Sequence, residues 1–80
     1  MAVDSEAGRL EMKYTVIIEK APANYAAYAP DLPGCVATGA SIEDAQKNMR
    51  AAIEWHLRSI REHGEPVPVP RAIATHINVA

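Results

Sequence analysis

Few side chains in this 80-residue chain would serve a catalytic or metal site: three histidines, one cysteine and ten acidic residues. His56 and His63 are seven positions apart in a helical stretch, which separates them by about 10 Å along the helix axis. A zinc-binding helix instead carries its two histidines four positions apart, with a glutamate between them. We interpret His56 and the isolated His76 as packing or interface residues and His63 as a residue of the last helical turn, and we expect no metal site.

Two acidic residues, Glu19 and Asp31, are expected near a strand end, where they would suggest a carboxylate pair for metal-dependent hydrolysis. A two-metal nuclease holds its ions about 4 Å apart and needs more carboxylates than these two. The remaining acidic residues fall on the predicted helix surface or near the N-terminus. Cys35 has no histidine nearby in sequence that would activate its thiol. We therefore expect no catalytic residue and no cofactor, and we interpret Cys35 as a core residue of a non-enzymatic protein.

The composition argues against nucleic-acid and membrane partners. The net charge is -2 and the pI is about 5.8, whereas a nucleic-acid-binding domain usually carries a basic surplus. No apolar run approaches the roughly 20 residues of a membrane span, and no apolar segment near the N-terminus resembles a secretory signal. The lone Cys35 cannot form a disulfide within the chain. A single reduced cysteine is consistent with a cytoplasmic protein.

The size of the chain favours self-association. A domain of this size buries only about 60% of the surface that its unfolded chain exposes, so its core alone is marginal. Small domains compensate with disulfides, metals or oligomers. Because the first two are not expected here, we predict a homodimer or tetramer. Residues 1–11 are small and polar without a clear period, and we interpret them as a flexible tail before a single domain of residues 12–80.

Three short strands are predicted in the first half of the chain. In the first, Tyr14, Val16 and Ile18 alternate with more polar residues, which is typical of a half-buried strand. A proline and an asparagine after it supply a hairpin turn. The predicted strands cover residues 12–20, 25–29 and 35–40, with the hairpin turn at residues 21–24.

A proline-rich corner joins this hairpin to the rest of the chain. Its two prolines and one glycine restrict the backbone to a turn of fixed shape. We predict an architectural role for the corner, and contact with a partner stays open. The corner motif consists of Tyr28, Pro30, Asp31, Leu32, Pro33, Gly34 and Cys35.

The longest predicted element is a helix that begins after Ser41 and ends at His63. Ser41 is a favourable N-cap, and Asp44 resembles the acidic member of a capping box. Gly64 is expected in the left-handed conformation that commonly follows a helix. Apolar residues recur at helical spacing along one face. This face comprises Ile42, Ala45, Met49, Ile53, Leu57 and Ile60, together with His56.

Trp55 lies off this apolar face, beside Ala51 and Ser59. Tryptophan is enriched among the residues that dominate binding energy at protein interfaces. We therefore predict that Ala51, Trp55 and Ser59 form a candidate interface with another chain. The alternative is that Trp55 folds over the sheet edge or covers the linker that follows the helix.

The C-terminal region predicts a linker and a last strand. Residues 65–70 contain three prolines and should run extended, and residues 71–80 alternate apolar with small or polar side chains. The element order is then β-β-β-α-β, an α+β fold with three antiparallel strands and one long helix on one face. A right-handed crossover makes the last strand parallel to the first. The other face of the sheet has no cover within the chain, which again favours a partner.

Residues spread over most of the chain occur together in one known pattern. They are Met12, Lys13, Tyr14, Tyr28, Pro30–Cys35, Gly39, Ala45, Ala52–Glu54 and Gly64–Pro68. In this pattern the chain resembles the HicB antitoxin family, from residue 12 to about residue 70. The resemblance implies a partial ribonuclease H-like fold without the nuclease carboxylates. It also implies a HicA-type toxin as partner, a small basic ribonuclease whose catalytic histidine and RNA surface the antitoxin covers.

One departure from the family concerns DNA. Members that repress their own operon carry a C-terminal helix-turn-helix or ribbon-helix-helix module. Residues 71–80 fit either the last strand of the sheet or the first strand of such a module; we prefer the former and expect no direct DNA binding. Two alternatives to toxin neutralisation stay open: a stand-alone HicB-like oligomeric scaffold, and a degenerate ribonuclease H-like nuclease using Glu19 and Asp31.

Overall fold

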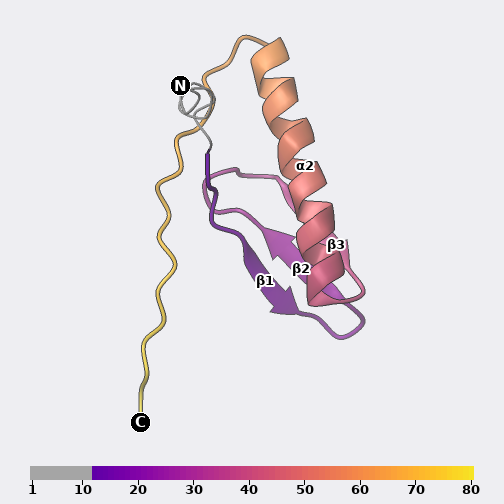
Figure 1. The fold of residues 1–80 in the computed structure, drawn as a ribbon, viewed down its shortest axis with the longest axis vertical. Coiled ribbons are helices and arrows are strands. Elements are labelled where there is room, and N and C mark those ends of the chain that lie inside the picture. The colour runs from indigo at the N-terminus through magenta and orange to yellow at the C-terminus, as the bar shows by residue number, and fades with distance from the viewer. Residues whose placement is uncertain (1–11) are drawn as a thin grey trace, which may run out of the picture.

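The computed structural model describes residues 12–80, and residues 1–11, which were predicted to form a flexible tail, lie outside the described residues. The elements follow one another as β1 (Ile17–Lys20), β2 (Tyr25–Tyr28), β3 (Val36–Gly39) and α2 (Ile42–Glu62). The strands form one antiparallel sheet in the order β1-β2-β3, and α2 lies across one face of it (Figure 1). This confirms the predicted α+β class, with three antiparallel strands followed by one long helix.

β1 and β2 form a hairpin that turns one face of β1 toward the core. Ala21 N–H donates to Asn24 O at 2.7 Å and closes the turn at residues 21–24. Ile18 packs against the core together with Tyr14 and Val16, which precede β1. The alternation of these three residues therefore correctly predicted which face of the first strand region packs against the core.

β3 leads into α2 through a close approach of two backbone segments. A Cβ atom on Gly39 would lie 2.7 Å from the Cα of Ala45 and closer still to its N atom, so a side chain does not fit there. Ala45 is completely buried at this contact. The first turn of α2 therefore rests directly on the end of β3, and this contact holds the helix against the sheet.

Both ends of α2 have hydrogen-bonded caps. Ser41 is the N-cap, and its Oγ accepts a hydrogen bond from Asp44 N–H at 3.1 Å. At the other end, Gly64 has φ +71°, and two backbone hydrogen bonds of the Schellman type surround it. These local signals set the helix bounds.

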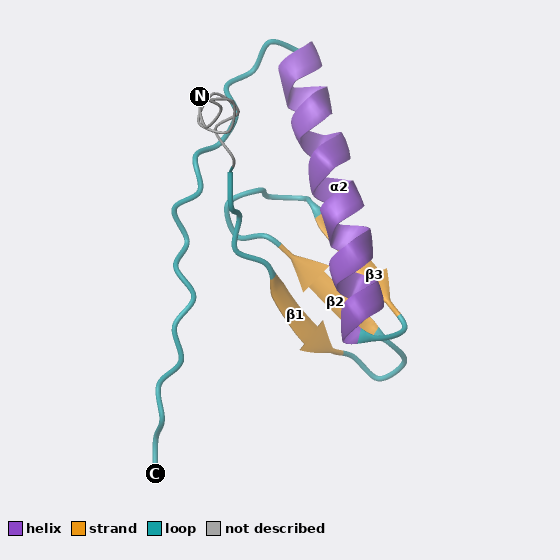
Figure 2. Ribbon diagram, viewed as in Figure 1, coloured by secondary structure: helices purple, strands orange, loops and turns teal. Residues whose placement is uncertain are grey.

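The hydrophobic core lies between α2 and the sheet (Figure 2). Met49 of the helix is 1% exposed, and Ile53 and Leu57 pack at the edge of the core. The predicted apolar face of the helix is correct at these positions, whereas Ile42 in the first turn remains 54% exposed. The buried core consists of Ala27, Ala29, Leu32, Cys35, Ala45 and Met49.

The predicted last strand is not formed among the described residues. Residues 65–80 contain neither helix nor strand and end far from the sheet (orange to yellow in Figure 1). β1 is also shorter than the predicted strand at residues 12–20. Both differences have one cause, since a strand needs a neighbouring backbone with which to exchange hydrogen bonds. Residues 12–16 lie beyond the end of the β1–β2 pairing, and the chain after residue 72 diverges from β1.

Side chains, instead of a strand ladder, hold the start of the C-terminal segment. Tyr14 Oη donates a hydrogen bond to Pro68 O, and Thr15 Oγ1 donates to Ala72 O at 2.9 Å. These bonds place residues 68–72 beside residues 14–15, so the segment does return to the first strand region before it departs.

Candidate partner-binding surfaces

The proline-rich corner supplies two buried residues to the core. Leu32 and Cys35 are 1% and 4% exposed, and Gly34 adopts φ +84° between them. Two turn hydrogen bonds brace the corner: Leu32 N–H donates to Ala29 O, and Cys35 N–H donates to Leu32 O. Burial raises the pKa of the Cys35 thiol, which keeps it protonated and poorly reactive. The arrangement is that of a packed structural turn.

Asp31 holds the C-terminal segment to the corner. Its Oδ2 accepts hydrogen bonds from Arg71 N–H at 2.8 Å and Ala72 N–H at 2.9 Å. These two backbone bonds, that from Ala72 first, and the nearby Arg71 charge lower the pKa of Asp31 below its ordinary value. Sequence reasoning missed this role, because a contact across 40 residues leaves no local pattern.

The sheet register keeps Glu19 away from Asp31. Glu19 pairs with Ala26 near the hairpin turn, whereas Asp31 follows the opposite end of β2, beyond Tyr28. The two carboxylates therefore do not form the pair that the nuclease alternative requires. Within residues 12–80, no group of three or more His, Cys, Asp or Glu residues is placed to hold a metal ion.

Trp55 stands on the solvent side of α2. Its side chain is 65% exposed, and Ala51, one turn earlier, is exposed as well. Ser59 is half-buried and lines a shallow hollow of about 480 Å³ with Pro33 and Pro68. This exposure argues against the alternative that Trp55 folds over the sheet edge or covers the linker. A contact between Trp55 and another chain stays a prediction.

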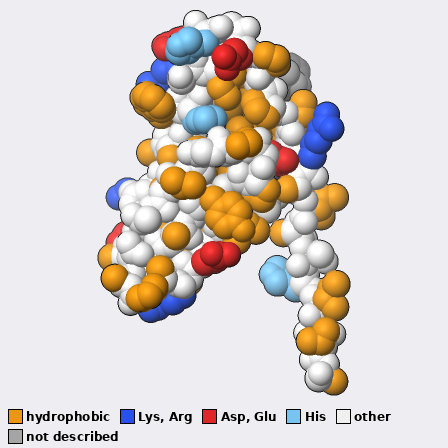
Figure 3. Space-filling model, turned by 180° about the vertical axis from the view of Figure 1, so that it is seen from behind, with side chains coloured by type: hydrophobic (Ala, Val, Ile, Leu, Met, Phe, Trp, Pro, Cys, Tyr) orange, Lys and Arg blue, Asp and Glu red, His pale blue; other side chains and the backbone are white. Residues whose placement is uncertain are grey.

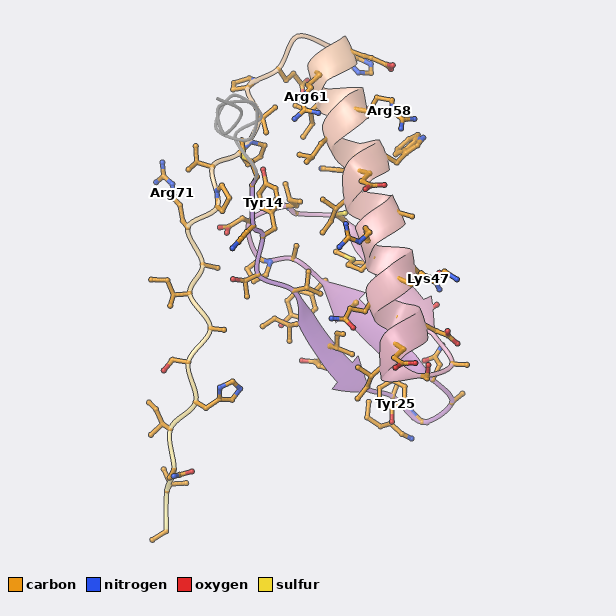
Figure 4. The ribbon with its side chains drawn as sticks, viewed as in Figure 1. Tyr14, Tyr25, Lys47, Arg58, Arg61 and Arg71 are labelled. Atoms are coloured by element: carbon orange, nitrogen blue, oxygen red, sulfur yellow. The ribbon has the colours of Figure 1, made fainter. Side chains whose placement is uncertain are left out.

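A larger groove of about 880 Å³ runs between α2 and residues 12–16. Its floor is apolar, with Tyr14, Val16 and Met49, and its rim carries charged residues of both signs. Arg61 extends from the last turn of α2 toward Tyr14 (Figure 4). Burial raises the pKa of Tyr14, and the Arg61 charge opposes this shift. An apolar floor with a polar rim is the usual anatomy of a protein-binding surface.

The sheet face opposite α2 carries a row of apolar residues. Ile17 pairs with Tyr28, and Tyr28 pairs with Val36, so the three side chains lie in line across all three strands. Tyr28 is 39% exposed and Val36 is 64% exposed. Hydrophobic side chains are visible across this side of the molecule in Figure 3. The prediction that the chain leaves this face uncovered holds for the described residues.

Within residues 12–80, α2 lacks the long apolar stretch that a membrane-spanning helix requires.

Comparison with known proteins identifies the family. The family described as "HicB_like antitoxin of bacterial toxin-antitoxin system" matches residues 14–80. The match thus includes residues 71–80, which the sequence assigns to a last strand. A solved chain of the "HicA3 and HicB3 toxin-antitoxin complex" has a TM-score of 0.64 and 30% identity, covering 74% of this chain and 70% of that one.

Similar proteins occur in a phage and in a cellular organism. A UPF0150 protein of Thermoplasma acidophilum is 40% identical over 71% of this chain and 84% of its own length. An uncharacterized protein of Haemophilus phage HP1, from its rep-hol intergenic region, is 34% identical over 84% of this chain. The matched region spans 50% of that phage protein. The matched range contains the corner, α2 and Gly64, and the chain is a member of the HicB-like antitoxin family of bacterial toxin–antitoxin systems.

Proposed function

We propose that this chain binds a HicA-type toxin and neutralises it by covering the surface with which the toxin acts. The observation that carries the proposal is the likeness, at 30% identity, to a chain of a solved toxin–antitoxin complex. Neutralisation of this kind needs no chemistry from the antitoxin, and the separation of Glu19 from Asp31 fits a non-enzymatic role. The reduced Cys35 thiol supports a cytoplasmic site of action.

Charge favours association with the basic toxin that the family implies. The chain carries a net charge of -2, and complementary charge raises the rate at which two proteins meet. The exposed Trp55 supplies an apolar anchor on the helix, and its 65% exposure leaves it free to contact a partner. We assign the helix surface of Ala51, Trp55 and Ser59 to contact with another chain.

Self-association is the second part of the proposal. The described residues bury few side chains fully, and only Leu32 and Met49 among the larger ones. Apolar residues remain exposed on the open sheet face, such as Val36, and on the C-terminal segment. A homodimer or tetramer would remove these side chains from water. We therefore propose that the antitoxin works as a homo-oligomer.

The first test is whether a short basic reading frame lies next to this gene, and the second is co-expression of this chain with the protein that such a frame encodes. Neutralisation requires that the neighbouring protein stop growth alone, that this chain restore growth, and that the two purify together. Purified protein should also block RNA cleavage by the toxin at a ratio near one to one, and Trp55→Ala should need a higher ratio than Glu54→Ala. If growth is not restored and no complex forms, the antitoxin proposal is wrong, and the stand-alone oligomeric scaffold replaces it.

The nuclease alternative has a separate test. The purified chain would have to cleave RNA with magnesium, and Glu19→Ala or Asp31→Ala would have to abolish the cleavage. We expect no cleavage in either the parent protein or the variants.

A further inference from the structure

The C-terminal residues form an extended segment with exposed apolar side chains that joins no sheet. Ile73, Ile77 and Val79 are 87%, 79% and 86% exposed, and they share one side of the extended segment because successive side chains alternate. The segment hangs free of the rest of the molecule in Figure 3. β-branched residues in alternation are typical of a strand with one buried face. In a single chain the apolar side of this segment has no surface to pack against.

The sheet, in turn, has an edge without a strand. β1 is the outer strand beside β2, so one side of its backbone carries unpaired N–H and C=O groups. Residues 12–16 continue the same extended edge, and the apolar groove lies between this edge and α2. Val16 and Ile18 point to this side and are only half-buried. A further strand at this edge would cover them.

The chain's own C-terminal segment passes this edge without pairing. Asp31 and Thr15 hold Arg71 and Ala72 beside the start of the edge. From there the segment runs away from β1 in the view of Figure 1, and the structure gives it no strand hydrogen bonds. Each copy thus has a segment that could donate a strand, residues 73–80, and an open edge at β1 that could accept one, but the two are not paired with each other.

We propose that residues 73–80 of one copy add as a fourth strand to the edge at residues 16–20 of a second copy, just beyond residues 14–15, beside which that copy's own residues 68–72 lie, and that the second copy does the same in return. Such an exchange forms a closed two-fold dimer in which both edges are paired. The five residues of this edge span about 17 Å, and the eight residues of the donated segment are long enough to pair along all of it. Ile73 and Ile77 enter the apolar groove, and His76 and Asn78 face away from it. This inference depends on the homo-oligomer part of the proposed function and not on the toxin.

A matched pair of variants tests the exchange. Ile77→Asp places a charge on the side that enters the groove, and Asn78→Asp places the same charge on the other side, one residue along. Both side chains are exposed in a single copy, so neither substitution should disturb a monomer. In the exchanged dimer, Ile77→Asp should weaken dimerisation at least about tenfold, because it removes a buried isoleucine and buries a carboxylate. Asn78→Asp should leave dimerisation unchanged.

Light scattering of the full chain over a range of concentrations measures the mass in solution and hence dimerisation. The exchange predicts twice the mass of one chain for the parent and for Asn78→Asp, and one chain mass for Ile77→Asp at low concentration. A monomeric parent at all concentrations contradicts both the exchange and the homo-oligomer. A dimer that Ile77→Asp leaves intact contradicts the exchange alone and leaves the homo-oligomer standing.

Photo-crosslinking separates a second copy from the chain's own edge. Val79→p-benzoylphenylalanine places a crosslinker near the end of the donated strand. The exchange predicts an adduct of two chains, with the attachment in residues 16–20 or in the groove-lining residues of α2. An adduct within one chain would show that the segment folds back on its own edge, and an adduct elsewhere on the second chain would place the contact on another surface. Either result overturns the proposal.

Discussion

Gly39 lies directly under Ala45, so that a Cβ atom at residue 39 would come within 2.7 Å of the Ala45 Cα. Both partners in this contact are backbone, so neither can move aside by changing a rotamer. Gly39→Ala should therefore shift α2 off the sheet and lower the free energy of unfolding by about 1–3 kcal/mol. Urea unfolding measures this change.

Gly34→Ala is the matched control for Gly39→Ala. Gly34 has φ +84° but no atom within 4 Å of its added Cβ, so the substitution costs only the left-handed backbone strain, about 1 kcal/mol. Equal losses in the two variants would contradict the close approach of β3 and α2.

The anchoring of the C-terminal segment by Asp31 should depend on pH and weaken in acid. Because the native pKa of Asp31 is lowered, its bonds to Arg71 and Ala72 add stability above the ordinary aspartate pKa. This stability is lost as the pH falls through the lowered native pKa, where the carboxylate takes up a proton. NMR hydrogen exchange should show that the Arg71 and Ala72 amides lose protection in this acid range before the core does. Asp31→Ala should remove that protection at neutral pH, and Glu54→Gln, on the exposed side of α2, should not.

Trp55→Ala should affect binding more than folding. The side chain is 65% exposed, so its removal leaves no cavity in the core. We expect the melting temperature to change little, while affinity for the toxin or for a second copy falls by about 2 kcal/mol, as at an interface hot spot. Light scattering and a melting curve, with Glu54→Ala as the control, measure both quantities. A large fall in melting temperature at unchanged mass would show that Trp55 is structural.

Cys35 should be almost inert in the folded protein. The thiol is 4% exposed, and burial raises its pKa above the ordinary value, which lowers the fraction of reactive thiolate at neutral pH. Alkylation by iodoacetamide should be slow in buffer and should accelerate in urea to the rate of a free thiol. The raised pKa also means that stability falls as the pH rises above the ordinary cysteine range. Fast alkylation in buffer would show that the corner opens readily.

Local signals in the sequence predicted the elements that depend on neighbouring residues. Ser41 and Gly64 mark the two ends of α2, and the spacing of apolar residues identified the face that carries Met49. Tyr14, Val16 and Ile18 identified the core face of the first strand region in the same way. These predictions succeeded because each depends on a period or a cap that lies within a few residues.

Features that join distant parts of the chain were not predictable in this way. The bonds from Asp31 to Arg71 and Ala72 depend on how the corner and the linker meet in space. The groove beside Tyr14 exists because α2 lies over β3 and β2 and leaves the β1 edge open. Residues 71–80 do carry a strand pattern, but a pattern of side chains does not specify which backbone the strand will join.

The order of the elements along the chain has a consequence for synthesis. β1, β2, β3 and α2 each pack against elements that are adjacent or nearly adjacent in sequence, and contacts of this kind form quickly. Because synthesis runs from the N-terminus, β1 and β2 leave the ribosome before residues 73–80 do. The β1 edge of each new chain would then be exposed before residues 73–80 of the same chain emerge, and chains made side by side from one message are well placed to exchange strands.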